Sequence, residues 1–370
     1  HTLLITLLLA MASISFAQST VSPSFIAFES APVRPIARAG KLLLVTNTPD
    51  NVLEVFKINS KGMLKAQASI PVGMEPVAVA IRQSKKGPEA WVVNHLSDSI
   101  SIIDLSRRPY RIKRTLLVGD EPRDIVFAKD KAFITTAHRG QHRIDPSIAG
   151  VVGAGDPKLY TASTPRADIW VFKGSNQGRE FGGKPEKIIE LYGDTPRALT
   201  VSNDGNSVYA AILNSGNQTT AITESALCNG FDDYGIAELW LGTEPCQMMD
   251  KISSPNGMKG AKIPGGRPGP GKNKQGEYQP WTGIIVKFDK KSGQWRDAKG
   301  RNYSNAVRFT LPDRDVFAIN ANNLQQTKAY SHVGTTLFNM AVNPVNGNIY
   351  VSNTDAQNHI RFEGSGDFGG

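Results

Sequence analysis

The residues best suited to chemistry in this sequence are histidines that follow similar apolar stretches. His95 follows Trp91-Val-Val-Asn94, and His138 follows Phe133-Ile-Thr-Thr-Ala137. Superposing all such stretches aligns Thr48, His95, His138, Leu213 and Thr354. Because neutral imidazole is a common metal ligand, two histidines on adjacent repeats could begin a metal site, to which His142 and His332 could add.

The alternative interpretation of these histidines is structural. A polar residue after such a stretch commonly hydrogen-bonds the backbone of a neighbouring turn, since buried backbone groups need partners. Only two of the five aligned positions are histidine, and no His-x-His or Glu pairing accompanies them. The pattern favours the structural role and leaves a metal site at His95 and His138 as the second hypothesis.

An acid–base pair recurs in two turns. Asp120-Glu-Pro-Arg123 and Asp194-Thr-Pro-Arg197 have the same spacing. Arginine binds carboxylates and phosphates through two parallel hydrogen bonds, so arginines gathered at one face could bind an anion. The alternative, that each Asp pairs with its Arg and fastens neighbouring repeats together, needs no ligand and is favoured.

Two cysteines, Cys228 and Cys246, lie 18 residues apart. Two thiols are too few for a four-cysteine iron–sulfur cluster or a Cys-rich zinc ribbon. In an oxidising compartment they favour a disulfide that closes a loop, worth roughly 3 kcal/mol on the chain-entropy model. A reactive thiol pair is the alternative.

The segment after the cysteines is basic and rich in Gly and Pro. Residues 251–280 hold six Lys or Arg and one Glu, more than half of the chain's net charge of +9. We expect a loop that is either solvated or in contact with an anionic surface. Nucleic acid is not expected, because aromatic residues are not interleaved with the charges. The sequence also lacks Gly-x-Ser-x-Gly, His-Glu-x-x-His and Walker motifs.

The residues at the two ends of the chain bear on the localisation of the protein. Residues 3–16 are apolar and uncharged, and Ser15-Phe16-Ala17 fits a small-x-small cleavage site. This is typical of a signal peptide over residues 1–17 rather than of a membrane anchor, so we expect the mature chain in the periplasm or outside the cell. Residues 364–370 end without a capping element, and we expect a truncated tail.

The elements that carry these residues repeat along the chain. A Gly-x-x-Pro turn before an apolar strand recurs at Gly73, Gly119 and Gly193, with a degenerate copy at Gly334. Strand pairs around polar turns occupy 43–56, 91–104 and 349–362. Four antiparallel strands in a unit of about 46 residues are typical of a β-propeller blade. We therefore predict an all-β propeller over 18–363, with loop inserts at about 137–166 and 214–282.

Five blades can be counted, and the last ends after its third strand. Residues 24–28 could supply the missing outer strand and close a five-bladed ring. Alternatively, further blades lie beyond Gly370, for a total of about seven. One of these must hold, because unpaired strand edges on an open ring invite aggregation.

Three stretches resemble YVTN-repeat β-propellers of one bacterial secreted subgroup: Thr46-Asn-Thr-Pro-Asp-Asn51, Trp91-Val-Val-Asn-His-Leu-Ser-Asp98 and Phe133-Ile-Thr-Thr-Ala-His-Arg-Gly140. The resemblance spans roughly residues 24–363. It implies that the chain continues with more repeats, and that some relatives add a c-type cytochrome region with a Cys-x-x-Cys-His motif. These 370 residues contain no such motif, so haem c is implied only for a missing C-terminal region and no cofactor is expected in this chain.

Two functions follow from these observations. The first is a non-catalytic scaffold, the N-terminal module of a larger protein linked to electron transfer, whose loop face docks another protein or its own missing C-terminal domain. The second is a propeller enzyme or metalloprotein with a His-lined site in the central funnel. The lack of a catalytic constellation favours the first. The candidate residues of the loop face are His95, His138, His142, Arg123, Arg197, Asp120, Asp194 and His332.

Overall fold

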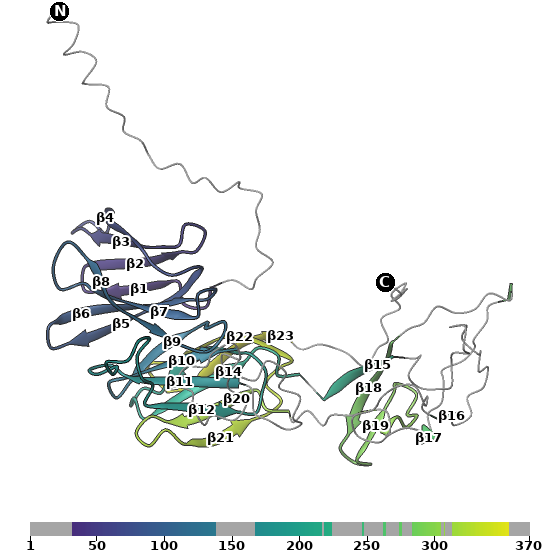
Figure 1. Cartoon of the computed structure of the whole chain (residues 1–370). Helices are drawn as coiled ribbons and strands as arrows, with labels where there is room; N and C mark the ends of the chain where they lie inside the picture. Colours follow the sequence, from purple (N-terminus) through teal and green to yellow (C-terminus); the bar gives the residue numbers. More distant parts are fainter. Residues whose placement is uncertain are drawn as a thin grey trace, which may run out of the picture. The chain divides into compact units, whose positions relative to one another are not determined.

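The computed structural model describes residues 32–137, 167–216, 218–223, 246–247, 262–263, 274–275, 283–304, 307 and 313–354. Within these ranges the protein is built of β-strands and turns, with no α-helix (Figure 1). None of the described segments is a helix long and apolar enough to cross a membrane. The chain divides into two compact units, one mainly before and one mainly after residue 188. The prediction of an all-β fold is confirmed.

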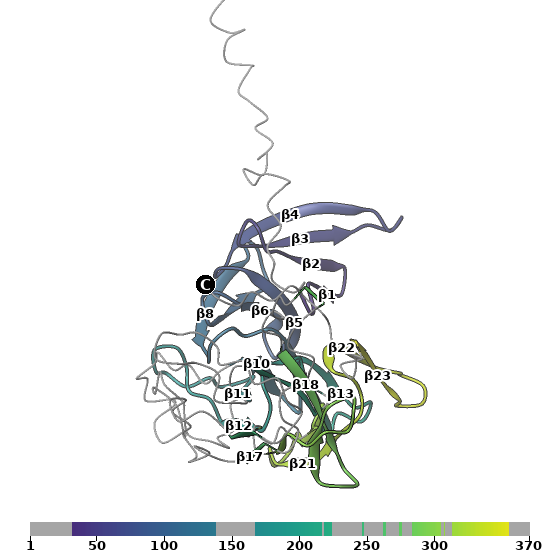
Figure 2. The ribbon, with the colours of Figure 1, turned by 90° about the vertical axis from the view of Figure 1, so that its right-hand side faces the viewer.

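The first unit contains three four-stranded antiparallel sheets. The first sheet has β1 (Ile36–Ala39), β2 (Leu42–Asn47), β3 (Val52–Ile58) and β4 (Leu64–Pro71), in that order. The second has β5 (Pro76–Ser84), β6 (Gly87–Asn94), β7 (Ser99–Asp104) and β8 (Arg111–Leu117), again in order. The third has β9 (Ile125–Ala128), β10 (Lys131–Thr136), β11 (Ala167–Lys173) and β12 (Lys187–Leu191). Figure 2 shows the strands of the first sheet succeeding one another from β1 to β4.

Short turns keep consecutive strands paired. In the first sheet Asn47 pairs with Val52, and in the second Asn94 pairs with Ser99, so the same four-residue loop joins strands two and three. The last loop residue has a left-handed backbone in both, with φ of 57° at Asn51 and 45° at Asp98. Asn and Asp tolerate this conformation better than other non-glycine residues, which explains their place there.

The second sheet is buried on both faces. Val79, Val92 and Ile103 pack with residues of the first sheet such as Leu44 and Val55 in one core cluster. The opposite face forms a second cluster with the third sheet. That cluster includes Trp91, Val93, Ile102, Ile134 and Trp170. A strand with neighbours on both faces favours apolar residues at successive positions, as in Ala90-Trp-Val-Val93 of β6. In β7 the buried Ser99 and Ser101 instead accept hydrogen bonds from Asn94 Nδ2.

The first sheet is buried on one face only. Leu44, Leu53 and Val55 are fully buried against the second sheet. Ile36, whose register partner is Val45, lies on the other face and is 57% exposed. Side chains alternate between the faces of a strand, so this outer face carries Val45 and Phe56 beside the charged Glu54 and Arg38, and it is partly exposed among the described residues of the first unit.

The second unit holds a fourth four-stranded antiparallel sheet, of β13 (Pro196–Val201), β14 (Ser207–Ile212), β20 (Val316–Asn320) and β21 (Gln326–Tyr330). A three-stranded sheet of β15 (Thr219–Thr223), β18 (Gly283–Asp289) and β19 (Gln294–Arg296) interrupts it in sequence. Two pairs complete the unit: β16 (Cys246–Gln247) with β17 (Lys262–Ile263), and β22 (Thr336–Val342) with β23 (Ile349–Thr354).

The segment between strands two and three of the fourth sheet is longer than predicted. We expected it to end near residue 282, with the apolar run 283–289 continuing the sheet. Instead, β18 pairs with β15 and β19, and β20 pairs with β14. Both runs have strand character, so local sequence could not decide between them. The interruption therefore runs from Leu213 to Asp315.

Other strands that the sequence predicts can be compared with the strands of the structure. The pairs 43–56 and 91–104 are confirmed. The pair 349–362 is described only as far as Thr354. Residues 1–17, 24–28, the insert at 138–166 and the tail 364–370 lie outside the described residues.

Candidate functional site

The Gly-x-x-Pro turns share one backbone conformation. The residue before the proline is left-handed in each, with φ of 54° at Glu75, 52° at Glu121 and 56° at Thr195. A positive φ is uncommon for a non-glycine residue and persists only where surrounding contacts enforce it. The three turns are therefore held in place by specific interactions.

Those interactions come from the preceding sheet. The Glu75 N–H donates to Asn51 Oδ1 at 2.7 Å, and the Glu121 N–H donates to Asp98 Oδ1 at 2.8 Å. Asn51 and Asp98 occupy the same place in the four-residue loops described above. Each sheet thus fastens the turn that starts the next one. The sequence analysis missed these two residues, although their shared position just before the third strand was a usable signal.

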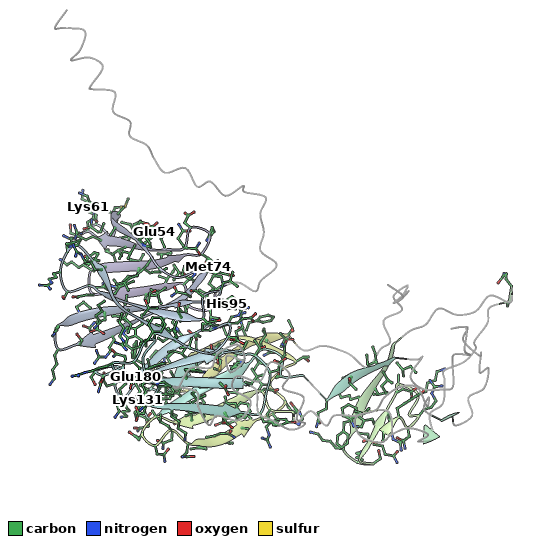
Figure 3. All side chains as sticks on the ribbon, viewed as in Figure 1. Glu54, Lys61, Met74, His95, Lys131 and Glu180 are labelled. Carbon is green, nitrogen blue, oxygen red and sulfur yellow. The ribbon has the colours of Figure 1, made fainter. Side chains whose placement is uncertain are left out.

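His95 connects a sheet to the following turn. Its ring is fully buried, and Nδ1 donates to the carbonyl of Pro122 at 3.3 Å. Its backbone N–H donates to the Glu75 carbonyl at 2.9 Å. Figure 3 shows His95 and Met74 near one another at the same end of the strands. This geometry fits the structural interpretation of His95.

The strand register changes the alignment of His138. In the second sheet Val79 pairs with Val92, and in the third Ile125 pairs with Ile134. Counting three residues onward from Val92 and Ile134 reaches His95 and Ala137. Ala137, not His138, therefore holds the position equivalent to His95, because the superposition was displaced by one residue. His138 and His142 themselves lie outside the described residues.

No group of three or more His, Cys, Asp or Glu side chains suited to a metal ion occurs among the described residues. Cys228 lies outside them, and Cys246 is described only as part of β16. The predicted disulfide stays a prediction, as does the basic loop at 251–280, of which only the short β17 and residues 274–275 are described.

Three arginines occupy the same position of the first strand in their sheets. The registers equate Arg34, Arg123 and Arg197. Arg34 forms a two-point ion pair with the fully buried Asp124, at 3.0 Å from Nε to Oδ1 and 3.2 Å from Nη2 to Oδ2. The nearby Asp124 carboxylate raises the pKa of Arg34 despite the cost of burial.

The predicted Asp–Arg partners contact other groups. Arg197 Nε donates to the carbonyl of Phe338 at 3.0 Å. The Asp194 carboxylate accepts from Asn214 Nδ2 at 3.2 Å. The Asp120 carbonyl accepts from the Ala137 N–H at 2.9 Å. The ion pair of Arg34 with Asp124 joins residues 90 positions apart, and sequence spacing gave no sign of it.

His332 belongs to a polar cluster in the second unit. Its Nδ1 pairs with Asp313 Oδ2, and Lys290 Nζ donates to its Nε2 at 2.6 Å. Its backbone is left-handed, with φ of 62°. The ring is exposed, and it joins the turn between β21 and β22 to the end of β18. The prediction named His332 but neither of its partners, which lie 19 and 42 residues away.

Asp315 lies two residues after Asp313 in the chain, and its side chain is fully buried. Burial raises the pKa of its carboxyl group, and the nearby Asp313 adds to this, while hydrogen bonds from the Val333 N–H and Ser215 oppose it. Val333 N donates to Oδ2 at 2.6 Å, whereas Oδ1 has no hydrogen-bond partner. A buried carboxylate with an unmatched oxygen is costly.

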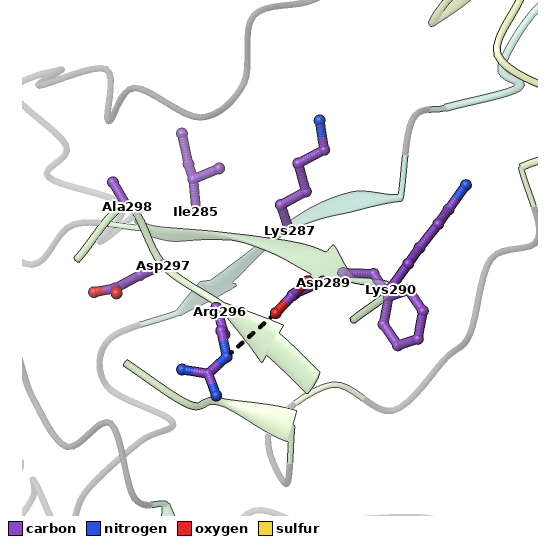
Figure 4. Close-up of a pocket in the computed structure, with 8 residues that line it drawn as sticks. Ile285, Lys287, Asp289, Lys290, Arg296, Asp297 and Ala298 are labelled. Atoms are coloured by element: carbon purple, nitrogen blue, oxygen red, sulfur yellow. Dashed lines mark ion pairs between the residues drawn. The ribbon is translucent and has the colours of Figure 1, made fainter. Parts of the chain in front are cut away.

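A cavity of about 370 Å³ lies on the three-stranded sheet, and its lining includes Lys287, Asp289 and Arg296. Figure 4 shows Arg296 and Asp289 directed toward one another, with Nε and Oδ2 3.7 Å apart. Hydrogen bonds from Ser292 and the Lys291 N–H lower the pKa of Asp289. Asp289 accepts hydrogen bonds from the Lys291 N–H and the Ser292 hydroxyl and so holds the tight turn between β18 and β19.

No protein-family model and no curated protein matches this chain. Among solved structures, the chain is similar to hydrazine synthase of Kuenenia stuttgartiensis, with 15% identity over 90% of this chain and 76% of that chain and a TM-score of 0.39. It is also similar to a putative 6-phosphogluconolactonase from Bacteroides uniformis, with 13% identity over 73% of this chain and 71% of that chain and a TM-score of 0.33. Likenesses this distant identify no function for the chain.

Proposed function

We propose that this chain is a β-propeller module that acts as a non-catalytic docking scaffold, in the periplasm or outside the cell. Its partner is another protein or a further C-terminal part of the same protein. The observation that carries the proposal is the outer face of the first sheet, which presents Ile36, Val45 and Phe56 and is partly exposed among the described residues of its unit. The matching faces of the second sheet are fully buried.

The stacking of the sheets supports a propeller. In the first unit, β1 contacts β5 and β5 contacts β9, so the first strands of successive sheets lie together. Each sheet also buries a face against the next. This is the arrangement of propeller blades, whose first strands line the central axis. We propose five blades in this chain and about seven in the whole protein, with the additional blades covering Ile36 and its neighbours.

We propose that the link to electron transfer lies in a continuation of the chain. A covalently bound haem c needs a Cys-x-x-Cys-His sequence, and Cys228 and Cys246 do not form one. The residues present therefore do not fit a haem, and we assign it to a C-terminal region that would dock on the scaffold.

The docking face can be tested by a substitution that is harmless in the isolated chain. Ile36→Lys places a charge on the uncovered face, where the side chain is already 57% exposed. Met63→Lys is the control, because Met63 is 65% exposed in the turn between β3 and β4. After the complete reading frame has been sequenced, residues 18–370 and the continuation are expressed separately and their association is measured by calorimetry.

We expect Ile36→Lys to weaken association at least about tenfold, because burying an unpaired charge costs more than 1.4 kcal/mol. Met63→Lys should leave it unchanged. Equal affinities for wild type and Ile36→Lys would contradict the docking face. A catalytic turnover by purified residues 18–370 alone would contradict the non-catalytic role.

A further inference from the structure

A second cavity, of about 560 Å³, lies beside the His332 cluster. Small-molecule sites commonly have volumes of 300–1,000 Å³, so it can hold a small metabolite. Its lining is mainly polar and comes from four places: the residue before β15, the turn after β18, the residues before β20, and β21 with the residue that follows it. The lining residues are Gln218, Lys290, Asp313, Arg314, Gln326, Thr327, Lys328, Ala329 and Ser331.

The charges around this cavity are unbalanced. Lys290, Arg314 and Lys328 contribute three positive charges, and Asp313 contributes one negative charge. Asp313 is already engaged by His332. Within the part of the chain that the structure describes, none of the three cations makes an ion pair. Lys328 instead lies over the ring of Tyr330, 4.5 Å from its centre.

His332 holds one of these cations in place. Its Nδ1 carries the proton shared with Asp313, so Nε2 can accept a hydrogen bond from Lys290 at 2.6 Å. An ammonium group has three N–H donors, and the imidazole uses one of them. The left-handed backbone of His332 is a local strain of the kind that gathers at binding sites.

We propose that this cavity binds a small anion bearing carboxylate or phosphate groups. Arg314 supplies a planar pair of N–H donors that matches either group. Lys290 and Lys328 supply further positive charge, and Gln326 supplies neutral donors for the ligand's other oxygens. The residues of this site all belong to the second unit, whereas the docking face belongs to the first sheet.

The test uses the full chain and two probes, inorganic phosphate and succinate, titrated by calorimetry at low ionic strength. Arg314→Ala and Lys328→Ala remove exposed side chains, so we expect both variants to fold, and their near-UV circular dichroism verifies this. Lys291→Ala is the matched control, since Lys291 is an exposed neighbour of Lys290 that does not line the cavity.

We expect one binding site per chain for at least one probe. Arg314→Ala should weaken binding about tenfold or more, because it removes a charge-assisted hydrogen bond, and Lys291→Ala should leave it unchanged. Binding of phosphate alone assigns phosphate esters, and binding of succinate alone assigns carboxylates. The proposal is overturned if neither probe binds, or if Lys291→Ala weakens binding as much as Arg314→Ala.

Discussion

A Cβ atom on Gly73 would lie 2.6 Å from Cγ and 2.7 Å from Cβ of Asn94. Gly334 has the same relationship with Asn353, at 2.6 Å and 2.8 Å. The asparagine at the end of strand two therefore occupies the space that a side chain in the turn would need. At Gly193 the facing residue is Ile212, and the corresponding distance is 3.2 Å.

This difference predicts a graded response to alanine. Gly73→Ala should lower the free energy of unfolding by about 1–3 kcal/mol, because overpacking forces the backbone to shift. Gly193→Ala should cost less, since the flexible side chain of Ile212 can move by a few tenths of an ångström. Urea denaturation of both variants measures this. Equal losses would show that the asparagine is not what excludes a side chain.

The pair between Arg34 and Asp124 predicts a position-specific effect. Arg34→Met keeps the apolar stem but removes both hydrogen bonds to a buried carboxylate, and should cost about 1–3 kcal/mol. Arg38→Met, four residues further along the chain, should change stability by less than about 0.5 kcal/mol, because Arg38 is exposed. Thermal unfolding compares the two. Similar midpoints would argue against a stabilising role for the pair.

The buried Asp315 predicts that the stability of the folded protein changes with pH in a definite direction. Its folded-state pKa is raised above the ordinary value of 3.8, mainly by burial, so the folded protein holds this proton more tightly than the unfolded chain. Its contribution to stability is therefore complete below pH 3.8 and is lost as the pH rises through the folded pKa.

Asp315→Asn abolishes this titration and should gain stability relative to wild type between about pH 4 and pH 7, as measured by denaturation at each pH. Asp289→Asn should show no such trend between about pH 4 and pH 7, because the Asp289 pKa is lowered from 3.8 and its contribution to stability is lost only as the pH falls below that value. A constant difference between wild type and Asp315→Asn across this range would refute the assignment.

Replacing His95 distinguishes a structural role of this residue from a role as a metal ligand. His95→Ala removes the hydrogen bond to Pro122 and leaves a buried space, so we expect a loss of about 1–3 kcal/mol. Metal analysis of the wild type and the variant should give the same content. A metal bound stoichiometrically by the wild type and lost from His95→Ala would restore the metal hypothesis.

The sequence predicted those features that depend on neighbours in the chain. Alternation and turn residues located the strand pairs 43–56 and 91–104 of the first two sheets, since hairpins such as Asn47 with Val52 are local. Aligning His138 with His95 failed because the register, with Ile125 opposite Ile134 and Val79 opposite Val92, is set by how the strands pair and not by the likeness of the residues around each histidine. Arg34 with Asp124, and Lys290 with His332, join distant segments, and only tertiary packing brings them together.

The long interruption of the fourth sheet has a consequence for how the protein folds during synthesis. Each sheet of the first unit up to β10 can form as soon as its strands leave the ribosome, because consecutive strands pair. Strand β14 must instead wait for β20, about 100 residues later. Closing so long a loop costs only about 3 kcal/mol more than closing a short hairpin, but the exposed edge of β14 is a site for mispairing during the delay. A chaperone that protects nascent chains should therefore matter most after residue 212 has emerged.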